Sequence, residues 1–272
     1  MPELPEVETV RRDLAAMYVG RALDRVVVTG RRTVRRHLPE RLSAVEGRAL
    51  TRIGRRGKYL LFEWDDGQVL VAHLRMSGQF VAVPTGAPTA PHTHAVLSFD
   101  GAGELRFIDP RTFGELFLAD GAHRPLAELS HMGPDALEVT PAYLAGLFAR
   151  RRAPLKALLV DQRAVAGIGN IYADEICWEA KLRPDRAGTS LSRREVNRLS
   201  AAIRAVLEAA ISARGSTLSD QRYRDLYGAV GAYQSQHRAY GRAGRPCPRC
   251  GRPVQRLRTG GKSAYFCPHC QR

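Results

Sequence analysis

The sequence of 272 residues has no apolar run of about 18 residues, the length that a membrane-spanning helix requires. Its first residues also lack the apolar stretch of a secretory signal peptide, so we expect a cytoplasmic protein. Acidic residues are few, since 27 Asp and Glu stand against 42 Lys and Arg. Internal repeats and low-complexity tracts are absent, which excludes repeat arrays.

The formal net charge of +15 exceeds what solubility requires and favours a polyanionic partner. A basic ribosomal protein or a membrane-surface protein would carry a similar charge, so charge alone leaves the class open. Hydrophobic residues make up 44% of the chain, and its length is sufficient for two domains with real cores. We therefore expect a globular protein.

Cysteine is scarce except near the C-terminus, where four of the five cysteines lie. The pairs Cys247-x2-Cys250 and Cys267-x2-Cys270 have the spacing of a tetrahedral four-thiolate zinc site. In a reducing compartment this clustering indicates a metal rather than disulfides. Because four protein ligands leave no open position, we expect one structural zinc ion that holds a short hairpin.

Basic and aromatic side chains lie between the two cysteine pairs. They are Arg252, Arg256, Arg258, Lys262, Tyr265 and Phe266. A stiff basic hairpin suits contact with a nucleic-acid backbone. A solvated charged hairpin with no partner is the alternative interpretation.

The N-terminal half has the patterns of β-strands. Short apolar or alternating segments bounded by Gly, Asp or Pro predict strands of an antiparallel sandwich or barrel, and they lie at 23–29, 58–64, 69–74, 95–99 and 104–108. The three prolines of Pro84–Pro91 indicate a loop between strands.

Beyond about Pro125 the patterns become helical. Leu144, Leu147 and Phe148 begin one helix, and Pro154 opens another. Ser192 and Glu195 have the spacing of a capping box before a third helix, whose apolar residues are Leu199, Ile203 and Leu207. Residues 215–244 show no sustained period, which indicates an extended or mobile loop. The fold class is therefore α+β.

The first nine residues, MPELPEVET, present a candidate nucleophile. Met1 precedes the small residue Pro2, a context in which methionine is usually removed, so the mature chain would begin with a secondary amine. An α-amino group titrates near ~7.7 to 8.0 and is far more often neutral at pH 7 than a lysine. Carboxylates that could protonate a departing oxygen follow at Glu3, Glu6 and Glu8.

The same nine residues also have the features of an ordinary N-terminal helix. Pro5 suits a first turn, and acids there complement the helix dipole. The apolar stripe of that helix consists of Val7, Val10, Leu14 and Met17. The N-terminal sequence alone does not separate a catalytic amine from a well-capped helix.

Three further motifs suit a nucleic-acid site. In Gly167-Ile168-Gly169-Asn170 the glycines permit a tight turn and Asn170 can cap the next helix, which would make a phosphate seat. Lys58 precedes an apolar strand and could reach into a cleft. Met76, Arg111 and Phe113 lie beside glycines at strand ends and could wedge a duplex where a nucleotide is flipped out. A common glycine turn, a surface lysine and core packing of Met76 and Phe113 are the respective alternatives.

In combination these motifs resemble the formamidopyrimidine-DNA glycosylase family, bacterial base-excision enzymes that remove oxidised purines such as 8-oxoguanine and then nick the DNA. The resemblance covers nearly the whole chain, through PELPEVET, RRGKYLLF, AHLRMSGQF, DPRTFGEL, LLVDQRAVAGIGNIYADE and the four-cysteine tail. It implies an N-terminal β-sandwich at 1–125, a helical domain with a helix–two-turn–helix and lesion loop at 126–240, and a zinc finger at 241–272. It also implies a monomer that binds double-stranded DNA with oxidised bases or abasic sites.

The resemblance implies roles for individual residues. Pro2 would attack C1′ of the damaged nucleotide, Glu3 would be the acid at the sugar ring oxygen, and Glu6 a supporting carboxylate. Lys58 would contact phosphate and assist β-elimination, with δ-elimination following. The residues expected to contact DNA are His73, Met76, His92, Arg111, Phe113, Arg151, Lys156 and Asn170, with Arg111 facing the orphaned cytosine.

Lys262 departs from the family pattern, which has arginine five residues before the third cysteine. Lysine keeps the charge but loses the bidentate fork, so we expect a weaker phosphate contact and weaker support for δ-elimination from this position. An endonuclease VIII-type enzyme for oxidised pyrimidines is one alternative, but that type typically has glycine where this chain has Leu4. A non-catalytic zinc protein that binds DNA is the other, and it leaves Pro2 beside Glu3 unexplained.

Overall fold

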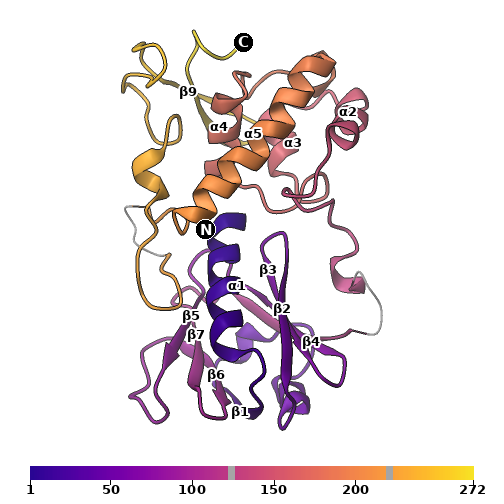
Figure 1. Cartoon of the computed structure of the whole chain (residues 1–272), viewed down its shortest axis with the longest axis vertical. Helices are drawn as coiled ribbons and strands as arrows, with labels where there is room; N and C mark the ends of the chain where they lie inside the picture. The colour runs from indigo at the N-terminus through magenta and orange to yellow at the C-terminus, as the bar shows by residue number, and fades with distance from the viewer. Residues whose placement is uncertain (122–125, 219–222) are drawn as a thin grey trace. The chain divides into compact units, whose positions relative to one another are not determined.

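The computed structural model describes residues 1–121, 126–218 and 223–272, which form two compact units (Figure 1). Unit 1 consists of Met1–Ser130 and Arg214–Ala232, and unit 2 of His131–Ala213 and Tyr233–Arg272. The segment Arg214–Ala232 thus packs with residues far from it in sequence. The expected domain boundary at residue 125 lies outside the described residues, and the division into three domains stays a prediction.

Unit 1 is an antiparallel sandwich with a helix, α1 (Leu4–Tyr18), packed against it. One sheet has the strand order β1-β6-β7-β5 and the other β2-β3-β4-β8. The strands are β1 (Leu23–Val28), β2 (Leu50–Arg56), β3 (Tyr59–Trp64), β4 (Gln68–His73), β5 (Gln79–Val83), β6 (Thr93–Phe99), β7 (Gly103–Ile108) and β8 (Glu115–Asp120). This confirms the expected sandwich.

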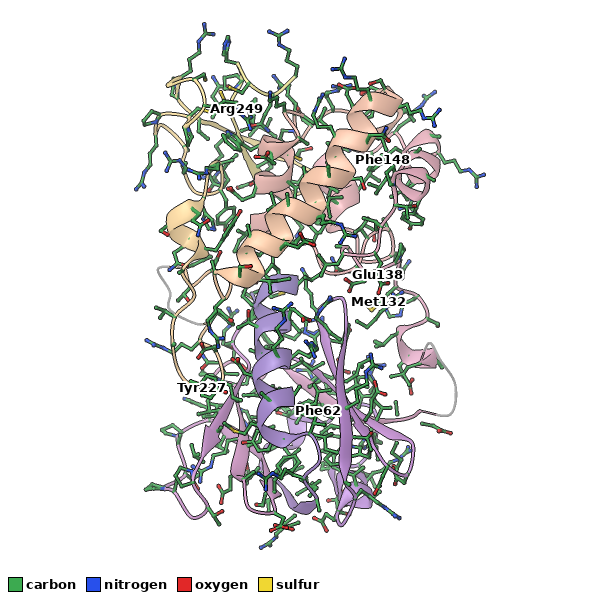
Figure 2. The ribbon with its side chains drawn as sticks, in the orientation of Figure 1. Phe62, Met132, Glu138, Phe148, Tyr227 and Arg249 are labelled. Carbon is green, nitrogen blue, oxygen red and sulfur yellow. The ribbon has the colours of Figure 1, made fainter. Side chains whose placement is uncertain are left out.

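A single apolar core joins the two sheets and α1. Val7, Val10 and Leu14 of α1 are buried there together with Phe62, which is labelled in Figure 2. Strand β6 shows why the sheets bury one face: alternate residues from Thr93 to Phe99 are buried, as the two-residue period of a strand requires. The apolar stripe of α1 therefore faces the core, and its polar end residues remain available for other roles.

The five predicted strand segments all correspond to strands, and the predicted loop at Pro84–Pro91 lies between β5 and β6. Strands β2, β5 and β8 were not among them. Strand β2 carries three arginines in seven residues, which hides its alternation. It pairs with β3 from Leu50 opposite Trp64 to Arg56 opposite Tyr59.

Unit 2 contains the helices and the cysteine hairpin. The elements are α2 (Pro141–Ala149), α3 (Leu155–Val160), α4 (Asn170–Glu179), α5 (Arg193–Ser212), the short 3-10 helices η4 (Gly188–Ser190) and η5 (Tyr233–Gln236), and strands β9 (Gln255–Thr259) and β10 (Lys262–Phe266). The capping box at α5 is confirmed, because the Glu195 N–H donates to Ser192 Oγ at 3.3 Å and the Ser192 N–H to Glu195 Oε2 at 2.9 Å. Among the helices of the described residues, none has the length and apolarity needed to cross a membrane.

The β9–β10 hairpin turns through two glycines with positive φ, 56° at Gly260 and 76° at Gly261. Two-residue hairpin turns of this hand require φ above zero at both positions, which glycine adopts without strain. A Cβ on Gly260 would lie 2.8 Å from the Cβ of Ala157, so the hairpin tip packs closely against α3. The turn places Lys262 at the exposed start of β10.

Candidate active site and metal centre

The N-terminus of α1 holds Pro2 and Glu3 in a buried and capped arrangement. Glu3 is the N-cap residue and forms a capping box with Glu6, in which the Glu3 N–H donates to Glu6 Oε2 at 2.8 Å. Pro2 is buried, and Glu3 and Glu6 are only 2% and 1% exposed. The N-terminal residues therefore do form a capped helix. This helix holds Pro2 and Glu3 in fixed positions, as a catalytic amine and acid would need.

The second carboxylate oxygen of Glu6 contacts a distant segment of unit 1. The Ser216 N–H donates to Glu6 Oε1 at 2.7 Å. Gly215 has φ of +78°, and a Cβ there would lie 2.7 Å from the same oxygen. Glycine is thus required at 215 by both conformation and space. Glu6 joins the start of α1 to the residues after α5, a contact that no local sequence pattern indicates.

Arg214 reinforces this attachment. Its Nη2 lies 2.5 Å from Asp13 Oδ2 on α1 and 2.6 Å from Asp225 Oδ2. The Tyr223 hydroxyl donates to the Arg214 carbonyl at 3.1 Å, and burial together with the nearby Glu6 charge raises the pKa of Tyr223. Tyr223 and Leu226 are buried in the unit 1 core. This part of the predicted loop is therefore packed, while residues 219–222 of it lie outside the described residues.

Glu8 has a different environment from Glu3 and Glu6. Burial alone would raise the pKa of Glu8, but hydrogen bonds and charges from Arg11, Arg12 and Arg55 outweigh it and lower the pKa to about 2. Arg11 binds both carboxylate oxygens, and Arg55 Nε donates at 3.0 Å. A carboxylate held by three guanidinium groups stays ionised and cannot supply a proton. This leaves Glu3 and Glu6 as the candidate acids at the N-terminus.

Lys58 lies in the two-residue turn between β2 and β3 and is buried, with 4% of its surface exposed. Arg55 attaches that turn to α1, since it donates both to Glu8 and to the Gly57 carbonyl. The neighbouring strand presents His73 opposite Tyr59, with the two rings 4.4 Å apart. The surface-lysine alternative is therefore wrong for Lys58.

His73 is neutral in the folded protein. The Arg75 N–H donates to His73 Nδ1 at 2.9 Å, so Nδ1 is an acceptor and the ring proton sits on Nε2. Burial, followed by the charges of Arg75 and Lys58, lowers the pKa of His73 to about 3. His73 can therefore donate one hydrogen bond, but it brings no positive charge to a phosphate near neutral pH.

The depressed pKa of His73 predicts a loss of stability in acid. Between the unfolded value of about 6.5 and the folded value of about 3 the unfolded chain binds the extra proton, so stability falls as pH falls, by about 1.4 kcal/mol per pH unit. We expect His73→Gln to be less stable at pH 7 but to lose about 2 kcal/mol less than the wild type between pH 7 and pH 5. Urea unfolding at the two pH values measures this difference.

His131→Gln is the matched control, because it removes an exposed histidine from unit 2. It should keep the wild-type change in unfolding free energy between pH 7 and pH 5. Equal losses for His73→Gln and the wild type would show that His73 titrates normally in the folded protein.

Met76, Arg111 and Phe113 project from loops at the ends of strands. Met76 is 38% and Phe113 43% exposed, so the core-packing alternative is wrong for both. Arg111 is exposed as well, and its Cζ lies 4.6 Å from the centre of the Phe113 ring. Exposed apolar side chains at loop tips, one of them stacked under a guanidinium, have the composition of a wedge for stacked bases.

Asp109 organises these loops, and sequence reasoning missed it. Its carboxylate, fully buried, accepts hydrogen bonds from Ser77 Oγ at 2.5 Å and from the Gly114 N–H at 2.6 Å. Its own N–H donates to the carbonyl of His92, an exposed residue with φ of 64°. One aspartate thus holds together the loops of Met76, His92 and Phe113. The turn sequence Asp-Pro-Arg-Thr after a strand was the available signal.

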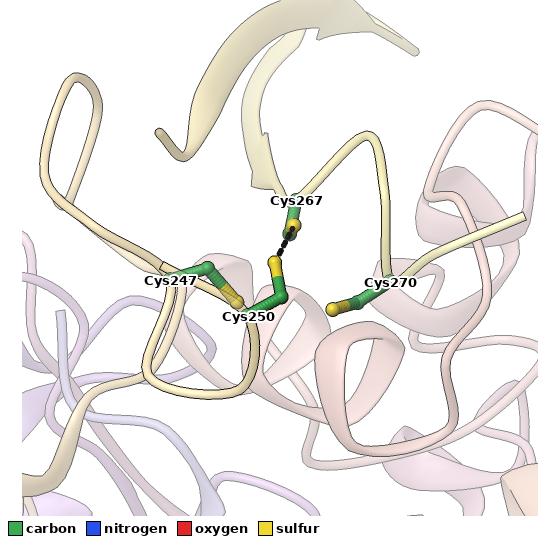
Figure 3. Close-up of side chains that lie close together, drawn as sticks. All are labelled: Cys247, Cys250, Cys267 and Cys270. Carbon is green, nitrogen blue, oxygen red and sulfur yellow. Dashed lines mark hydrogen bonds between the residues drawn. The ribbon is translucent and has the colours of Figure 1, made fainter. Parts of the chain in front are cut away.

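The four thiols of Cys247, Cys250, Cys267 and Cys270 converge in unit 2, and all Sγ atoms lie within 4.8 Å of one another (Figure 3). A tetrahedron of sulfurs about 2.3 Å from zinc has edges of roughly 3.8 Å, so the cluster fits one zinc ion. The Sγ atoms of Cys250 and Cys267 are 3.5 Å apart. Among the described residues no other Cys, His, Asp or Glu joins this group. The zinc is therefore structural.

Neighbouring side chains support the zinc ligands. Trp178 Nε1 donates to Cys247 Sγ at 3.4 Å, and the Cys267 N–H donates to Gln271 Oε1 at 2.7 Å. Gln271 also donates through Nε2 to the Leu182 carbonyl at 2.9 Å. Donors to ligand sulfurs and bonds to ligand backbones orient the ligands. The zinc site is thus anchored to the helical part of unit 2.

Lys156 points into the interior rather than toward solvent. Its Nζ lies 2.7 Å from Asp174 Oδ1 and donates to the Ser263 carbonyl at 2.5 Å, and only 1% of the residue is exposed. Asp174 accepts from the Tyr265 N–H at 3.2 Å. Burial raises the pKa of Asp174 to about 7, and Lys156 acts against that rise. This ion pair joins α3, α4 and β10, so the ammonium of Lys156 is already committed within the protein.

Asn170 is the first residue of α4, and Gly169 is the N-cap, so the expectation that Asn170 caps the helix is wrong. The reason is the extended backbone of Gly169, which takes the capping position itself. The Asn170 Oδ1 atom has no hydrogen-bond partner among the described residues. Gln162 holds the preceding turn, since it accepts from the Gly167 N–H and donates to the Ile168 carbonyl.

The remaining predicted contact residues are exposed. Lys262 stands beside the hairpin turn, and Arg151 follows α2. Arg151 Nη1 lies 3.0 Å from Asp161 Oδ2, with both side chains partly exposed. Exposed ion pairs of this kind contribute little to the stability of the fold. Arg151 can therefore exchange Asp161 for a phosphate at a small cost in free energy.

The fold and these sites define the class of DNA glycosylases that combine a β-sandwich, a helix–two-turn–helix domain and a zinc finger. The chain matches the formamidopyrimidine-DNA glycosylase N-terminal domain over residues 1–116, the H2TH domain of the same enzymes over 132–222, and the zinc finger found in FPG and IleRS over 244–272. The chain belongs to the formamidopyrimidine-DNA glycosylase family.

Relatives and solved structures agree with this assignment. The formamidopyrimidine-DNA glycosylase of Thermus thermophilus is 47% identical over 100% of this chain and 98% of its own length. A crystal structure of the MutM (Fpg) protein from that organism has a TM-score of 0.86 and 45% identity, covering 99% of this chain and 98% of the other. Lactococcus lactis Fpg in complex with a DNA containing N7-benzyl-Fapy-dG has a TM-score of 0.88 and 33% identity, covering 100% of both chains.

Proposed function

We propose that this protein is a bifunctional DNA glycosylase and abasic-site lyase that excises oxidised purines, such as 8-oxoguanine and formamidopyrimidines, from double-stranded DNA. The observation that carries the proposal is the buried Pro2 at the capped start of α1, beside Glu3 and Glu6. Once Met1 is removed, Pro2 presents a secondary amine in a rigid position. A covalent enzyme requires such a nucleophile with an acid close by.

In this mechanism the Pro2 nitrogen forms a bond to C1′ of the damaged nucleotide, and the bond from C1′ to the base breaks. The base leaves with the bonding electron pair and takes up the proton that the Pro2 amine loses. Glu3 then protonates the ring oxygen O4′, and the ring opens. The product is an iminium ion between Pro2 and C1′. Glu6 supports the reaction indirectly, because its two oxygens hold the Glu3 N–H and the Ser216 N–H.

The iminium ion also accounts for strand cleavage. Its positive charge acidifies the C2′ proton, so removal of that proton expels the 3′ phosphate in β-elimination, and a second elimination expels the 5′ phosphate. Lys58, buried next to His73 and held near α1 through Arg55, contacts phosphate and assists the first elimination. Water then hydrolyses the iminium and releases Pro2 as an amine.

The exposed residues serve binding and base extrusion. Met76, Arg111 and Phe113 fill the space of the extruded nucleotide, and Arg111 faces the orphaned cytosine. Asn170 and Lys262 contact the phosphates on either side of the lesion. His73, His92 and Arg151 make further contacts with the DNA. Lys156 acts by holding β10 through Asp174 and Ser263. We further propose that the enzyme acts as a monomer in the bacterial cytoplasm.

Borohydride trapping tests the proposed function. The protein is incubated with duplex DNA containing 8-oxoguanine opposite cytosine, then with borohydride, which reduces an iminium to a stable adduct. A covalent adduct on this duplex, absent on undamaged DNA, is the expected result. Preference for a duplex with an oxidised pyrimidine would favour the endonuclease VIII alternative, in which glycine is typical at the position of Leu4. A protein that forms no adduct on any lesion would be the non-catalytic alternative.

Lys262→Ala should weaken binding of lesion-containing DNA by about tenfold, because a phosphate contact in the hairpin is lost, and should reduce the salt slope by about one. Lys262→Arg should bind more tightly than the wild type, since arginine forms a bidentate phosphate contact. Fluorescence anisotropy across a salt series measures both effects.

Arg252→Ala is the control for loss of one positive charge from the same zinc finger, and Arg252 is also exposed. If Lys262→Ala and Arg252→Ala weaken binding equally, Lys262 contributes only general charge. Unchanged incision kinetics and salt dependence in Lys262→Ala would contradict its assignment to a phosphate contact.

A further inference from the structure

Helix α2 of unit 2 is unusual because it has no charged residue. Its sequence, PAYLAGLFA, is apolar around the whole circumference, yet only Leu144 and Phe148 are buried. Tyr143 is 36% exposed, and Ala142, Ala145 and Ala149 are exposed as well. A helix that is apolar on all sides is normally covered on all sides. The exposed face of α2 therefore has the composition of a surface that packs against something else.

A groove of about 580 Å³ runs along this face. Pro141, Ala142, Ala145, Phe148 and Ala149 of α2 form one wall, and their spacing places them on one side of the helix. The other wall comes from η4 and the first turns of α5, through Thr189, Leu191, Arg193, Val196 and Asn197. Figure 2 labels Phe148 at this position beside α5. The volume lies in the range of about 300 to 1,000 Å³ that is typical of ligand-holding clefts.

Small residues keep the groove open. The alanines of α2 end at Cβ, and Gly188 of η4 carries no side chain. A Cβ on Gly188 would lie 2.7 Å from Leu158 Cδ1, 2.9 Å from the Arg151 carbonyl oxygen and 3.3 Å from Phe148 Cδ1. Any other residue would therefore push η4 away from the helices that it now contacts. The groove is a consequence of close packing at Gly188 beside a row of short side chains.

The charge on the groove lining is positive. Arg193 is the only charged residue among the described residues that line it. Arg150 follows Ala149 of the lining, and Arg194 follows Arg193; both are exposed. The acid closest to Arg193 in sequence, Glu195, is bound by Arg186 with a separation of 2.6 Å.

Two of these arginines stand where the helix dipole disfavours positive charge, with Glu195 as the acid in the same turn. Arg193 and Arg194 begin α5, where the helix dipole already places partial positive charge and favours acids. A bound carboxylate would relieve this repulsion. The combination therefore suits a ligand that brings negative charge and an apolar group together.

We propose that the groove between α2, η4 and α5 binds a short acidic segment of a partner protein, with a leucine, isoleucine or phenylalanine side chain in the groove and a carboxylate against Arg193. The segment form follows from Pro141, Ala142, Ala145 and Ala149, which form an apolar row along the length of α2 at the groove. A DNA strand would leave the apolar walls without a matching group, because its outer surface is phosphate. This docking site is separate from the proposed catalytic function and does not depend on it.

Fluorescent octapeptides test the proposal directly. Each peptide carries three glutamates around one leucine, isoleucine or phenylalanine, and binding to the full chain is followed by fluorescence anisotropy. Two matched series replace either the apolar residue with serine or the glutamates with glutamine. We expect binding of the parent peptides and at least tenfold weaker binding in both matched series. Failure of every parent peptide to bind below about 1 mM would overturn the proposal.

Two variants locate the binding surface. Ala145→Trp fills the groove from the α2 wall, and Arg193→Glu reverses the charge at its edge; each should weaken peptide binding at least tenfold while base excision is unchanged. Arg204→Glu makes the same charge change on α5, about 16 Å further along the helix, and should bind peptide as the wild type does.

Other occupants of the groove give different results. If Ala145→Trp weakens DNA binding but leaves peptide binding unaltered, the groove belongs to the DNA surface and the proposal is wrong. If sedimentation shows a dimer of the wild type that Ala145→Trp dissociates, the occupant is a second copy of the chain. Peptide binding that all three variants retain would place it elsewhere and would also contradict the proposal.

Discussion

A chain that retains an N-terminal extension before Pro2 is expected to lose base excision, strand nicking and borohydride trapping together. The extension converts the Pro2 amine into an amide nitrogen, whose lone pair is delocalised and does not attack C1′. Loss of a covalent nucleophile lowers rates by roughly 10⁴-fold or more in other enzymes. The fold should be unaffected, because the capping of α1 involves Glu3 and Glu6 rather than the terminal nitrogen.

The extension is best made removable, since the same molecule then serves as its own control. A protease site placed so that cleavage leaves Pro2 as the first residue should restore trapping in proportion to the fraction cleaved. Binding of a duplex with a reduced abasic-site analogue, which cannot react, separates loss of chemistry from loss of access. If the extended chain is trapped as rapidly as the cleaved chain, the nucleophile is not Pro2.

Pro2→Gly supplies an independent test without added residues. Glycine leaves a free terminal amine but removes the ring that fixes the backbone at the entry to α1. We expect the covalent adduct on the 8-oxoguanine duplex to be lost or strongly reduced. Full trapping by both Pro2→Gly and the extended chain would indicate a lysine nucleophile, and Lys58 would be the first candidate.

The sequence allows prediction of features whose partners are close together in the chain. The capping box of Ser192 and Glu195 and the paired cysteines are of this kind, as is the apolar stripe of α1. Strand β6 was predictable for the same reason, because buried and less buried residues alternate within seven consecutive residues. Strand β2 was missed because arginines occupy both of its faces.

The connections that position the candidate catalytic residues were not predictable, since their partners are distant in sequence. Glu6 binds Ser216, and Lys156 binds the carbonyl of Ser263. Only the folded chain brings these residues together. The same limit explains His73, whose lowered pKa comes from burial and from the charges of Arg75 and Lys58. Composition identifies a histidine, but its protonation state depends on the packing around it.

The error at Asn170 has a local cause. Asparagine is a favoured N-cap residue, so a Gly-Asn pair before an apolar run gives two adjacent candidates for the cap. Gly169 has the extended backbone of an N-cap residue, so glycine rather than Asn170 caps the helix. Asn170 consequently keeps a side-chain oxygen without a partner among the described residues. A phosphate contact of Asn170 would use its Nδ2 hydrogens, because Oδ1 and the phosphate oxygens are both acceptors.

Loss of the zinc ion is expected to have a large effect on the β9–β10 hairpin and on DNA binding. Strands β9 and β10 have five residues each, and the apolar cluster around them contains Trp178, Ala239, Val254 and the cysteines themselves. So small a core does not hold a hairpin alone, whereas zinc binding supplies about 10 to 16 kcal/mol in isolated zinc fingers. Cys250→Ser should therefore disorder the hairpin and remove the contact of Lys262 with DNA.

Cys250→Ser is expected to contain no tightly bound zinc and to bind lesion DNA at least tenfold more weakly, with most helical circular dichroism retained. The helices should persist because α4 and α5 pack against each other and bury Ile203 and Leu207 without help from the hairpin. Cys177→Ala is the matched control, since it removes the fully buried cysteine outside the cluster. It should keep one zinc per chain. A Cys250→Ser protein that binds DNA as tightly as Cys177→Ala would show that the zinc finger is dispensable for recognition.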